Sequence, residues 1–457
     1  MTDLQFAGEF ELNEVKIISA SGNSIDNITP LEINIYESIF SNSLTGNISV
    51  ADTNNLLELL PLVGDEELIL KMTTPTLQGQ ETSIDFTKNA FAIYNVSVNT
   101  ELSAGSSVYV LEFCSPELLL NNRVRVSKAF TDTPSKIVET ILTESRYINT
   151  TKKIEEEKTS GIKNIIVPNQ RPFDFIRCFI QDCKSEKGSP HYLFYETTRG
   201  YNFRTLQNLY EKPTVATFSN SDPGPDEMVG NTLGIQQALN TMINFSINPP
   251  NNALDDSRGG LLGGKVITHN IFNKSYNVNS YGYFSDFDKY KRIGDNDNPK
   301  YNSNLGDWVD SRIYVHPTSV SGANLDAQYK DETNSNTNVV ANKINETILY
   351  RKSRMYELNF SKTIAVTIHG TTNIAAGDMV ELNYAAPGRN HNDGTLDKSI
   401  SGRYLITKLR HTFSPVTSNH EINMVVTRDS LPTELPSDVD VAPTKKEGKA
   451  EVINVAT

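Results

Sequence analysis

The sequence of 457 residues lacks the features that mark membrane-spanning, secreted and disulfide-stabilised proteins. No apolar run approaches the ~18 residues that a membrane-spanning helix needs. The opening stretch MTDLQFAGEF has neither a basic nor an apolar segment, so no secretory signal is expected. The cysteines, Cys114, Cys178 and Cys183, are odd in number and too few for a disulfide framework. The sequence therefore favours a protein made in a reducing cytosol, with no membrane insertion.

Positive charge is also scarce. Lysine and arginine together number 42 against 55 aspartates and glutamates, which gives a formal net charge of −13 at pH 7. Because binding to phosphate groups needs a surplus of Lys and Arg, an acidic chain is a poor general binder of nucleic acid. A surface that repels phosphate would still suit a conduit through which a polyanion must slide.

Recognisable cofactor and calcium motifs are missing. The glycine pairs at 259–260 and 263–264 match neither a dinucleotide fingerprint nor a phosphate loop, and a flexible start to a strand is the favoured interpretation. Asp295 and Asp297 lie in a D-x-D-x-P run without the glycine and the distal glutamate of a calcium loop. A solvated loop is therefore favoured there, and we expect no cofactor.

Catalytic and metal-binding patterns are missing as well. His411 and His420 can face each other across a hairpin, but no third ligand stands at metal spacing. No Ser-His-Asp, Cys-His or paired-carboxylate arrangement stands out. We therefore expect no catalytic residues and no metal site, and we predict that the chain is not an enzyme.

What the sequence does contain is period-two alternation, most clearly from Lys362 to Asp429. Apolar residues alternate with polar ones over 364–368, 404–409 and 422–426, which is typical of strands with one buried face. Gly377-Asp378 stands just before the next apolar pair, where a tight turn feeds a strand and glycine adopts positive φ without strain. We predict a small antiparallel β-barrel or curled sheet in this region.

The same pattern stands near the N-terminus at an offset of 313 residues. Gly64 lies 27 residues before Phe91 (91 − 64), and Gly377 lies 27 residues before Tyr404 (404 − 377). The offset of 313 also aligns apolar residues of two further strands: Ile93 with Ile406, Val96 with Leu409, Tyr109 with Ile422, Leu111 with Met424, and Phe113 with Val426. One offset held through two strands without a gap favours duplication over chance agreement between two β domains.

The intervening sequence has a different texture. Thr133-Pro134 opens an amphipathic helix as an N-cap followed by proline. A second helix is expected from Pro172 to Gly188, with lysines in its last turn, and a hairpin is expected on Arg199-Gly200. A further helix is expected over residues 338–354, and a glycine-rich insert before it contains alternating strands.

The predicted fold class is mainly β with α+β parts. We expect a first β-barrel domain over residues 1–118 and a small α+β domain over 119–215. A second, homologous barrel comprises 216–250 and 338–431, with a β-rich insert over 251–337. Beyond it, residues 432–457 form a Pro-rich, charged tail that is extended unless a partner holds it.

Several stretches carry a resemblance to a known family. They are SNSLTGNISVADTNNLLELLPLVGDEEL (41–68), NNRVRVSKAF (121–130), KVITHNIFNKSYNVNSYGYFSDFDKY (265–290) and GRYLITKLRHTFSPVTSNHEINMVVTRDS (402–430). Their order resembles that of the baseplate hub protein of contractile phage tails, of the T-even type and its cyanophage relatives. The hub half of type VI secretion spike proteins is more distantly similar. Asn270 stands where aspartate is common in the family.

The resemblance implies a structural protein of the virion tail baseplate that is made in the host cytoplasm. Such hubs form homotrimers in which two homologous barrels per chain build a ring of six, matching a sixfold tail tube to a threefold spike. The implied partners are a trimeric central spike protein and a tail tube or tube-initiator protein, with DNA only in transit through the lumen. We expect the tail to contact the spike or a neighbouring subunit through Pro432, Pro436, Val439 and Val441.

Two alternatives remain open from the sequence. One is the hub of a related contractile injection system that carries no genome, and genes for a capsid nearby would distinguish the two. The other is an unrelated β-rich protein that binds or hydrolyses glycans, which detectable glycan binding or turnover by the isolated chain would favour.

Overall fold

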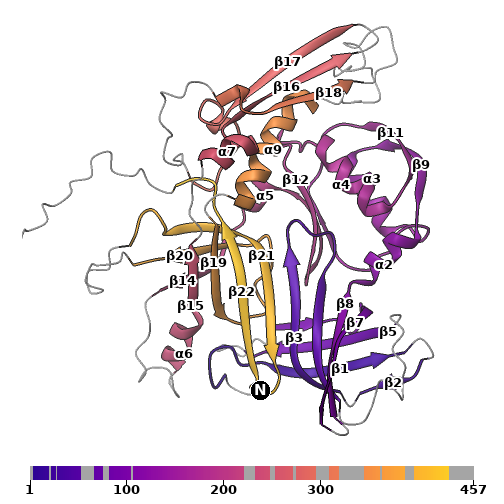
Figure 1. The fold of residues 1–457 in the computed structure, drawn as a ribbon, viewed down its shortest axis with the longest axis vertical. Helices are drawn as coiled ribbons and strands as arrows, with labels where there is room; N and C mark the ends of the chain where they lie inside the picture. Colours follow the sequence, from indigo (N-terminus) through magenta and orange to yellow (C-terminus); the bar gives the residue numbers. More distant parts are fainter. Residues whose placement is uncertain are drawn as a thin grey trace, which may run out of the picture.

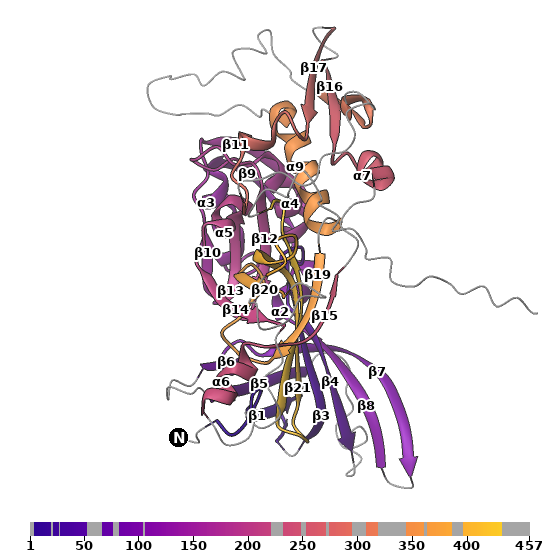
Figure 2. The ribbon, with the colours of Figure 1, turned by 90° about the vertical axis from the view of Figure 1, so that its left-hand side faces the viewer.

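The computed structural model describes residues 4–19, 22–26, 28–52, 66–75, 82–103, 106–220, 232–247, 253–270, 274–294, 308–318, 344–360, 363–385 and 396–431. The molecule is elongated, with the strands of two β domains towards one end and a three-stranded sheet at the other (Figure 1). A small α+β domain lies between these ends, above the first β domain (Figures 1 and 2). Gly64-Asp65, Asp295, Asp297 and the four tail residues named above lie outside the described residues.

One sheet of fourteen strands contains both β domains. The first domain contributes β1 (Glu11–Ile18), β2 (Ser24–Ile25), β3 (Thr29–Ser38), β4 (Thr45–Asp52), β5 (Glu66–Thr74), β6 (Thr82–Asp85), β7 (Phe91–Ser103) and β8 (Ser106–Cys114). The second contributes β14 (Thr214–Ser219), β15 (Met242–Ile247), β19 (Thr363–His369), β20 (Met379–Asn383), β21 (Gly402–Ser414) and β22 (Asn419–Thr427), with α6 (Thr232–Leu239) beside them.

The duplication predicted from the offset of 313 is present in the strand pairing. The order β3-β4-β8-β7-β5 of the first domain repeats as β15-β19-β22-β21-β20 in the second. Ile93 lies opposite Phe113 and Ile406 lies opposite Val426, and a bulge follows at the same place in β7 and β21. A bulge is an extra residue that changes the register, so its repetition at one position supports common ancestry of the two domains.

The two domains differ in their sixth strand. β1 runs antiparallel to β5, whereas β14 runs parallel to β20. Among the described strands no pairing closes either set on itself, so the two separate barrels stay a prediction. Each domain nevertheless has its own apolar core, built in the first around residues such as Ile48 and Phe113 and in the second around Val366 and Met424.

The α+β domain packs its helices against two short sheets. Its elements are α2 (Pro116–Arg123), β9 (Val126–Asp132), α3 (Pro134–Thr143), β10 (Ile154–Glu156), β11 (Lys163–Gln170), α4 (Pro172–Phe179), η1 (Ile180–Asp182), β12 (Tyr192–Thr197), β13 (Gly200–Thr205) and α5 (Leu206–Tyr210). The helix after Thr133 and the hairpin on Arg199-Gly200 are as predicted. The second helix was predicted too long, because the chain turns into an isolated β-bridge between Thr159 and Ser185.

The insert forms a separate sheet that packs on a long helix. Its elements are α7 (Ala253–Gly259), β16 (Gly263–Asn270), β17 (Ser275–Gly282), η3 (Phe287–Lys289), η5 (Trp308–Asp310) and β18 (Ile313–Thr318), and the helix is α9 (Ile344–Phe360). The predicted end of this helix at residue 354 is wrong, because buried Glu357 and Leu358 continue it to Phe360. None of the helices in the described ranges is long and apolar enough to cross a membrane.

Candidate assembly site at the junction of the two β domains

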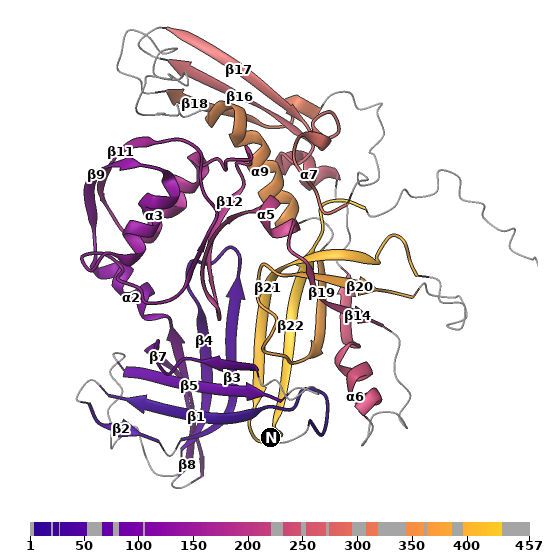
Figure 3. The ribbon, with the colours of Figure 1, turned by 180° about the vertical axis from the view of Figure 1, so that it is seen from behind.

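The two β domains meet edge to edge rather than through side chains alone. β21 of the second domain pairs antiparallel with β3 of the first, with Lys408–Phe413 opposite Ser38–Ile33 (Figures 1 and 3). The sheet therefore continues from one domain into the next without a break. Ile33, Ile35 and Phe413 are fully buried at this junction, so the ladder also carries an apolar face.

Aromatic and histidine rings fill the lower part of the junction. Phe413 stacks on His420 with ring centroids 4.0 Å apart, and Phe10 packs edge-on against Phe413 at 5.1 Å. His411 Nδ1 lies 3.0 Å from His420 Nε2, so the two histidines do face each other as the sequence suggested. Burial lowers the pKa of His411 to about 3, and burial and then His411 hold the pKa of His420 well below its ordinary value. Both rings are therefore neutral at physiological pH.

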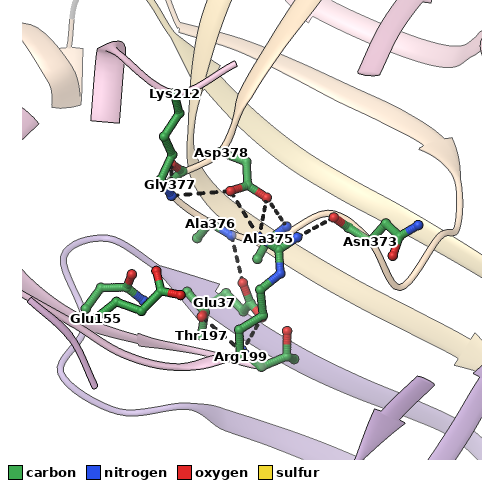
Figure 4. A network of polar contacts seen from close by, with 12 residues as sticks. Glu37, Glu155, Thr197, Arg199, Lys212, Asn373, Ala375, Ala376, Gly377 and Asp378 are labelled. Atoms are coloured by element: carbon green, nitrogen blue, oxygen red, sulfur yellow. Dashed lines mark hydrogen bonds and ion pairs between the residues drawn. The ribbon is translucent and has the colours of Figure 1, made fainter. Parts of the chain in front are cut away.

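A buried carboxylate joins three parts of the chain at the upper end of the junction (Figure 4). Glu37 of β3 accepts a hydrogen bond from the Thr198 amide on the α+β hairpin and another from the Ala376 amide on the second β domain, both at 2.7 Å. Burial raises the pKa of Glu37, although the two amides work in the opposite direction. One side chain thus holds the first β domain, the α+β domain and the second β domain together.

The loop that Glu37 contacts is itself held by ion pairs. Arg199 lies 2.9 Å from Asp378, and Lys212 lies 3.4 Å from the same carboxylate (Figure 4). Asp378 also accepts a hydrogen bond from the Ala375 amide. Gly377 has φ of +87°, as the sequence predicted for this turn, and a Cβ there would stand 2.2 Å from the Tyr195 hydroxyl. Gly377 is therefore required by both backbone conformation and space, and Asp378 by its ion pairs.

A second buried charge cluster ties the α+β domain to the first β domain. Lys152 lies 2.8 Å from Glu117 and 2.6 Å from Glu196, and all three side chains are almost completely buried. Glu196 also accepts hydrogen bonds from the Leu44 amide and the Ser115 hydroxyl. Burial works against the charge on Lys152, yet Glu196 and Glu117 raise its pKa. Both carboxylates depend on Lys152 as their positive partner, so loss of the lysine would leave two buried carboxylates without one.

The insert is fastened to the end of β22 in a similar way. Arg354 of α9 lies 2.6 Å from Asp429 and 3.1 Å from Glu357, and Arg292 lies 3.1 Å from Glu357. Burial opposes the charge on Asp429, but Arg354 and Arg292 hold its pKa below the ordinary value. The Arg428-Asp429 pair at the end of the last resemblance motif is thus an anchor for the chain before its tail.

Two strand edges that match the internal junction remain open in the described structure. β7 pairs with β5 only through Phe91–Ile93, so its edge from Asn95 onward has no strand partner among the described residues. β15 pairs with β19 alone and ends the sheet. These edges correspond to β21 and β3, and they lie at opposite sides of the two-domain unit (Figure 1).

The sequence predicted no metal site and no phosphate-binding loop, and the described residues can be compared with both predictions. No cluster of three His, Cys, Asp or Glu that could hold a metal ion occurs in the described ranges. The glycine pairs at 259–260 and 263–264 lie between the end of α7 and the start of β16, not between a strand and a helix. Glu37 was not predicted from the sequence. It follows Ile33 and Ile35 at every second position of β3, so it is a charged residue on the buried face of the strand.

Comparison with known proteins agrees with the resemblance drawn from the motifs. No family model matches the chain. A probable baseplate hub protein of the Vibrio phage KVP40 is 23% identical over 436 residues, covering 93% of this chain and 94% of that protein. The chain is therefore similar to baseplate hub proteins over nearly its whole length.

Solved structures agree in fold. A tail protein from Neisseria meningitidis MC58 superposes with a TM-score of 0.52 at 10% identity, covering 94% of this chain and all of that one. The 43 kDa tail protein of prophage MuSo2 from Shewanella oneidensis also gives 0.52, at 8% identity, covering 91% and 98%. At such low identity these structures establish the fold alone.

Proposed function

We propose that this chain is a structural, non-enzymatic baseplate hub of a contractile phage tail, and that three copies form a ring in the virion baseplate. The proposal rests on one observation: the chain contains one complete junction between β domains, and it also carries both halves of a second. β21 paired with β3 is the complete junction, while β7 and β15 are the corresponding open edges.

The register of the second junction follows from the first. His411 lies opposite Ile35 within the chain. Asn99 corresponds to His411, because their partners Tyr109 and Ile422 are 313 residues apart, and Ile247 corresponds to Ile35 at the same level of the ladder. Asn99 of one subunit should therefore lie opposite Ile247 of the next. By the same argument Thr100 lies opposite Ser246, and Glu101 opposite Phe245.

The open edges have the character of surfaces that a partner covers. Ile243 and Ile247 of β15 are 48% and 39% exposed, and Tyr94 of β7 is 44% exposed. An uncovered edge strand with apolar side chains is a site for uncontrolled association, and proteins normally pair or protect it. A head-to-tail contact repeated by rotation closes into a ring. Three chains with two domains each make a ring of six similar units.

The ring connects two symmetries. Its six β domains match a sixfold tail tube, and its three chains match a trimeric central spike. The insert lies at the end of the molecule far from the β domains, which suits one end for the tube and the other for the spike (Figure 2). With a net charge of −13, a lumen through the ring would let DNA pass without binding it.

Cysteine pairs across the proposed contact test the register. The variants N99C/I247C and T100C/S246C, made in a Cys178→Ser background, place thiols on directly opposed residues, and antiparallel partners lie within disulfide reach. Oxidation of the full chain, co-expressed with its spike, should give covalent trimers. The control T100C/I247C uses the same strands but opposite faces and should stay uncoupled. Equal cross-linking of control and matched pairs, or none in an assembled sample, overturns the proposal.

A further inference from the structure

A groove outside the β domains joins the α+β domain to the insert. It has a volume of about 450 Å³, and the end of α4, η1, α9 and β18 line it. One wall carries apolar side chains, among them Ile180, Ile348, Met355 and the 65% exposed Phe360. Binding of another segment to this apolar wall is favourable, because exposed apolar area costs free energy in water.

The groove is also basic, in a chain that is acidic as a whole. Arg177 and Lys352 line it, and the Arg312 guanidinium lies 5.6 Å from the centroid of the Tyr314 ring, which also lines it. Lys352 Nζ stands 4.3 Å from the Tyr314 ring centroid, and no carboxylate within the described ranges forms an ion pair with any of these three cations. Burial and then the charge of Arg312 lower the pKa of Lys352, which fits a site of positive potential.

The last described residues bring the chain to the same helix. Asp429 is bound to Arg354 of α9, and Leu431 is buried, so the tail departs from α9. Arg354 and Lys352 face opposite sides of the helix, since two residues rotate the direction by about 200°. A residue of extended chain spans about 3.3 Å, so about five residues are needed to carry the tail half-way around a helix about 10 Å across, a path of roughly 16 Å.

The first part of the tail complements the groove. The segment TELPSDVDV, residues 433–441, holds Glu434, Asp438 and Asp440, and no lysine or arginine follows before Lys445. Leu435, Val439 and Val441 alternate with these carboxylates. Acidic side chains for the cations and apolar side chains for the floor thus stand in one short stretch.

We propose that residues 436–441 bind in the basic groove of their own chain, with Asp438 and Asp440 on Arg177 and Lys352 and the aliphatic side chains on Met355 and Phe360. The tail then clamps the insert to the α+β domain. Tethering favours this occupant, because a segment held a few residues away is present at high effective concentration. The inference is independent of ring formation, and it assigns the predicted contacts of Pro436, Val439 and Val441 to the same subunit.

Distance measurement between two spin labels tests this directly in the full chain. One label goes on Asp174→Cys, exposed on α4 outside the groove, and the other on Ser437→Cys, with Cys178 replaced by serine. A short, narrow distance distribution is expected. The variant R177E/K352E should broaden and lengthen it, D438K/D440K should do the same, and the combined fourfold variant should restore it. An exposed charge swap away from the groove, K398E, should change nothing.

Mixing experiments identify the occupant. Doubly labelled chains diluted in unlabelled chains should keep the short distance, whereas a mixture of singly labelled chains should lose it. Short distances only in the singly labelled mixture would assign the tail to a neighbouring copy and overturn the proposal. A broad distribution that ignores every charge substitution would also overturn it, as would narrowing only when the spike protein is added.

Discussion

Replacing Glu37 by alanine removes the carboxylate that joins three parts of the chain and should destabilise it by about 3 kcal/mol. Two buried amides, those of Thr198 and Ala376, lose a charged acceptor, and hydrogen bonds to charged groups contribute about 1.5–3 kcal/mol each. The sum of about 3–6 kcal/mol is reduced because the variant no longer buries a carboxylate, whose pKa burial has already raised.

The assay is urea unfolding together with amide hydrogen exchange at the two donors. Glu37→Gln keeps one acceptor oxygen and should lose about half as much stability as the alanine variant. Glu32→Ala is the matched control on the same strand, where the carboxylate is half exposed and pairs with Arg410, so a change of at most about 1 kcal/mol is expected. If Glu37→Ala leaves both the unfolding midpoint and the exchange of the two amides unchanged, the carboxylate does not hold the junction.

Acid should weaken the junction through His411 and His420, because burial in the fold lowers their pKa values. Below about pH 6.5 the unfolded chain takes up protons on these histidines while the folded chain does not, so the free energy of unfolding falls as the pH drops. With a pKa of about 3 in the fold, His411 alone should lower the free energy of unfolding by about 2 kcal/mol at pH 5. In H411F/H420F the urea midpoint should therefore change less with pH between pH 5 and pH 7.5 than in the parent chain. Lys152→Met strands two buried carboxylates, Glu117 and Glu196, and should cost about 3–5 kcal/mol by urea unfolding. The triple variant with both glutamates changed to glutamine should recover much of that loss, and no recovery would contradict the charge argument.

Local patterns predicted much of the β architecture. The offset of 313 links β7 and β8 to β21 and β22, and it holds in the structure because the aligned apolar residues, such as Ile93 with Ile406 and Phe113 with Val426, are buried in both domains. Ile33, Ile35 and Glu37 stand at every second position of β3 and lie together on its inner face. A charged residue among the inward-facing positions of a strand indicates a buried polar contact, because a buried charge needs hydrogen-bond or ion-pair partners.

The partners of Glu37 could not be predicted from the sequence. They lie more than 160 and more than 330 residues away, and neither Thr198 nor Ala376 contributes a characteristic side chain, because the donors are backbone amides. The Lys152 cluster is hidden for the same reason, as its three charged residues are spread from Glu117 to Glu196 among many solvated ones. These contacts form only in the tertiary fold, so the local sequence around each residue does not predict them.

The two kinds of junction in the proposed ring are not chemically equal, and the difference follows from the duplication. Counted along the sequence, Pro249 stands two residues after Ile247 as Glu37 stands two residues after Ile35, so the proposed subunit contact lacks the carboxylate that fastens the internal one. Proline also has no backbone amide proton to donate to a strand partner. Covalent linkage places the stronger junction inside the chain, where it forms on folding, and leaves the weaker one for association. A ring built this way assembles from three rigid pairs rather than from six separate domains.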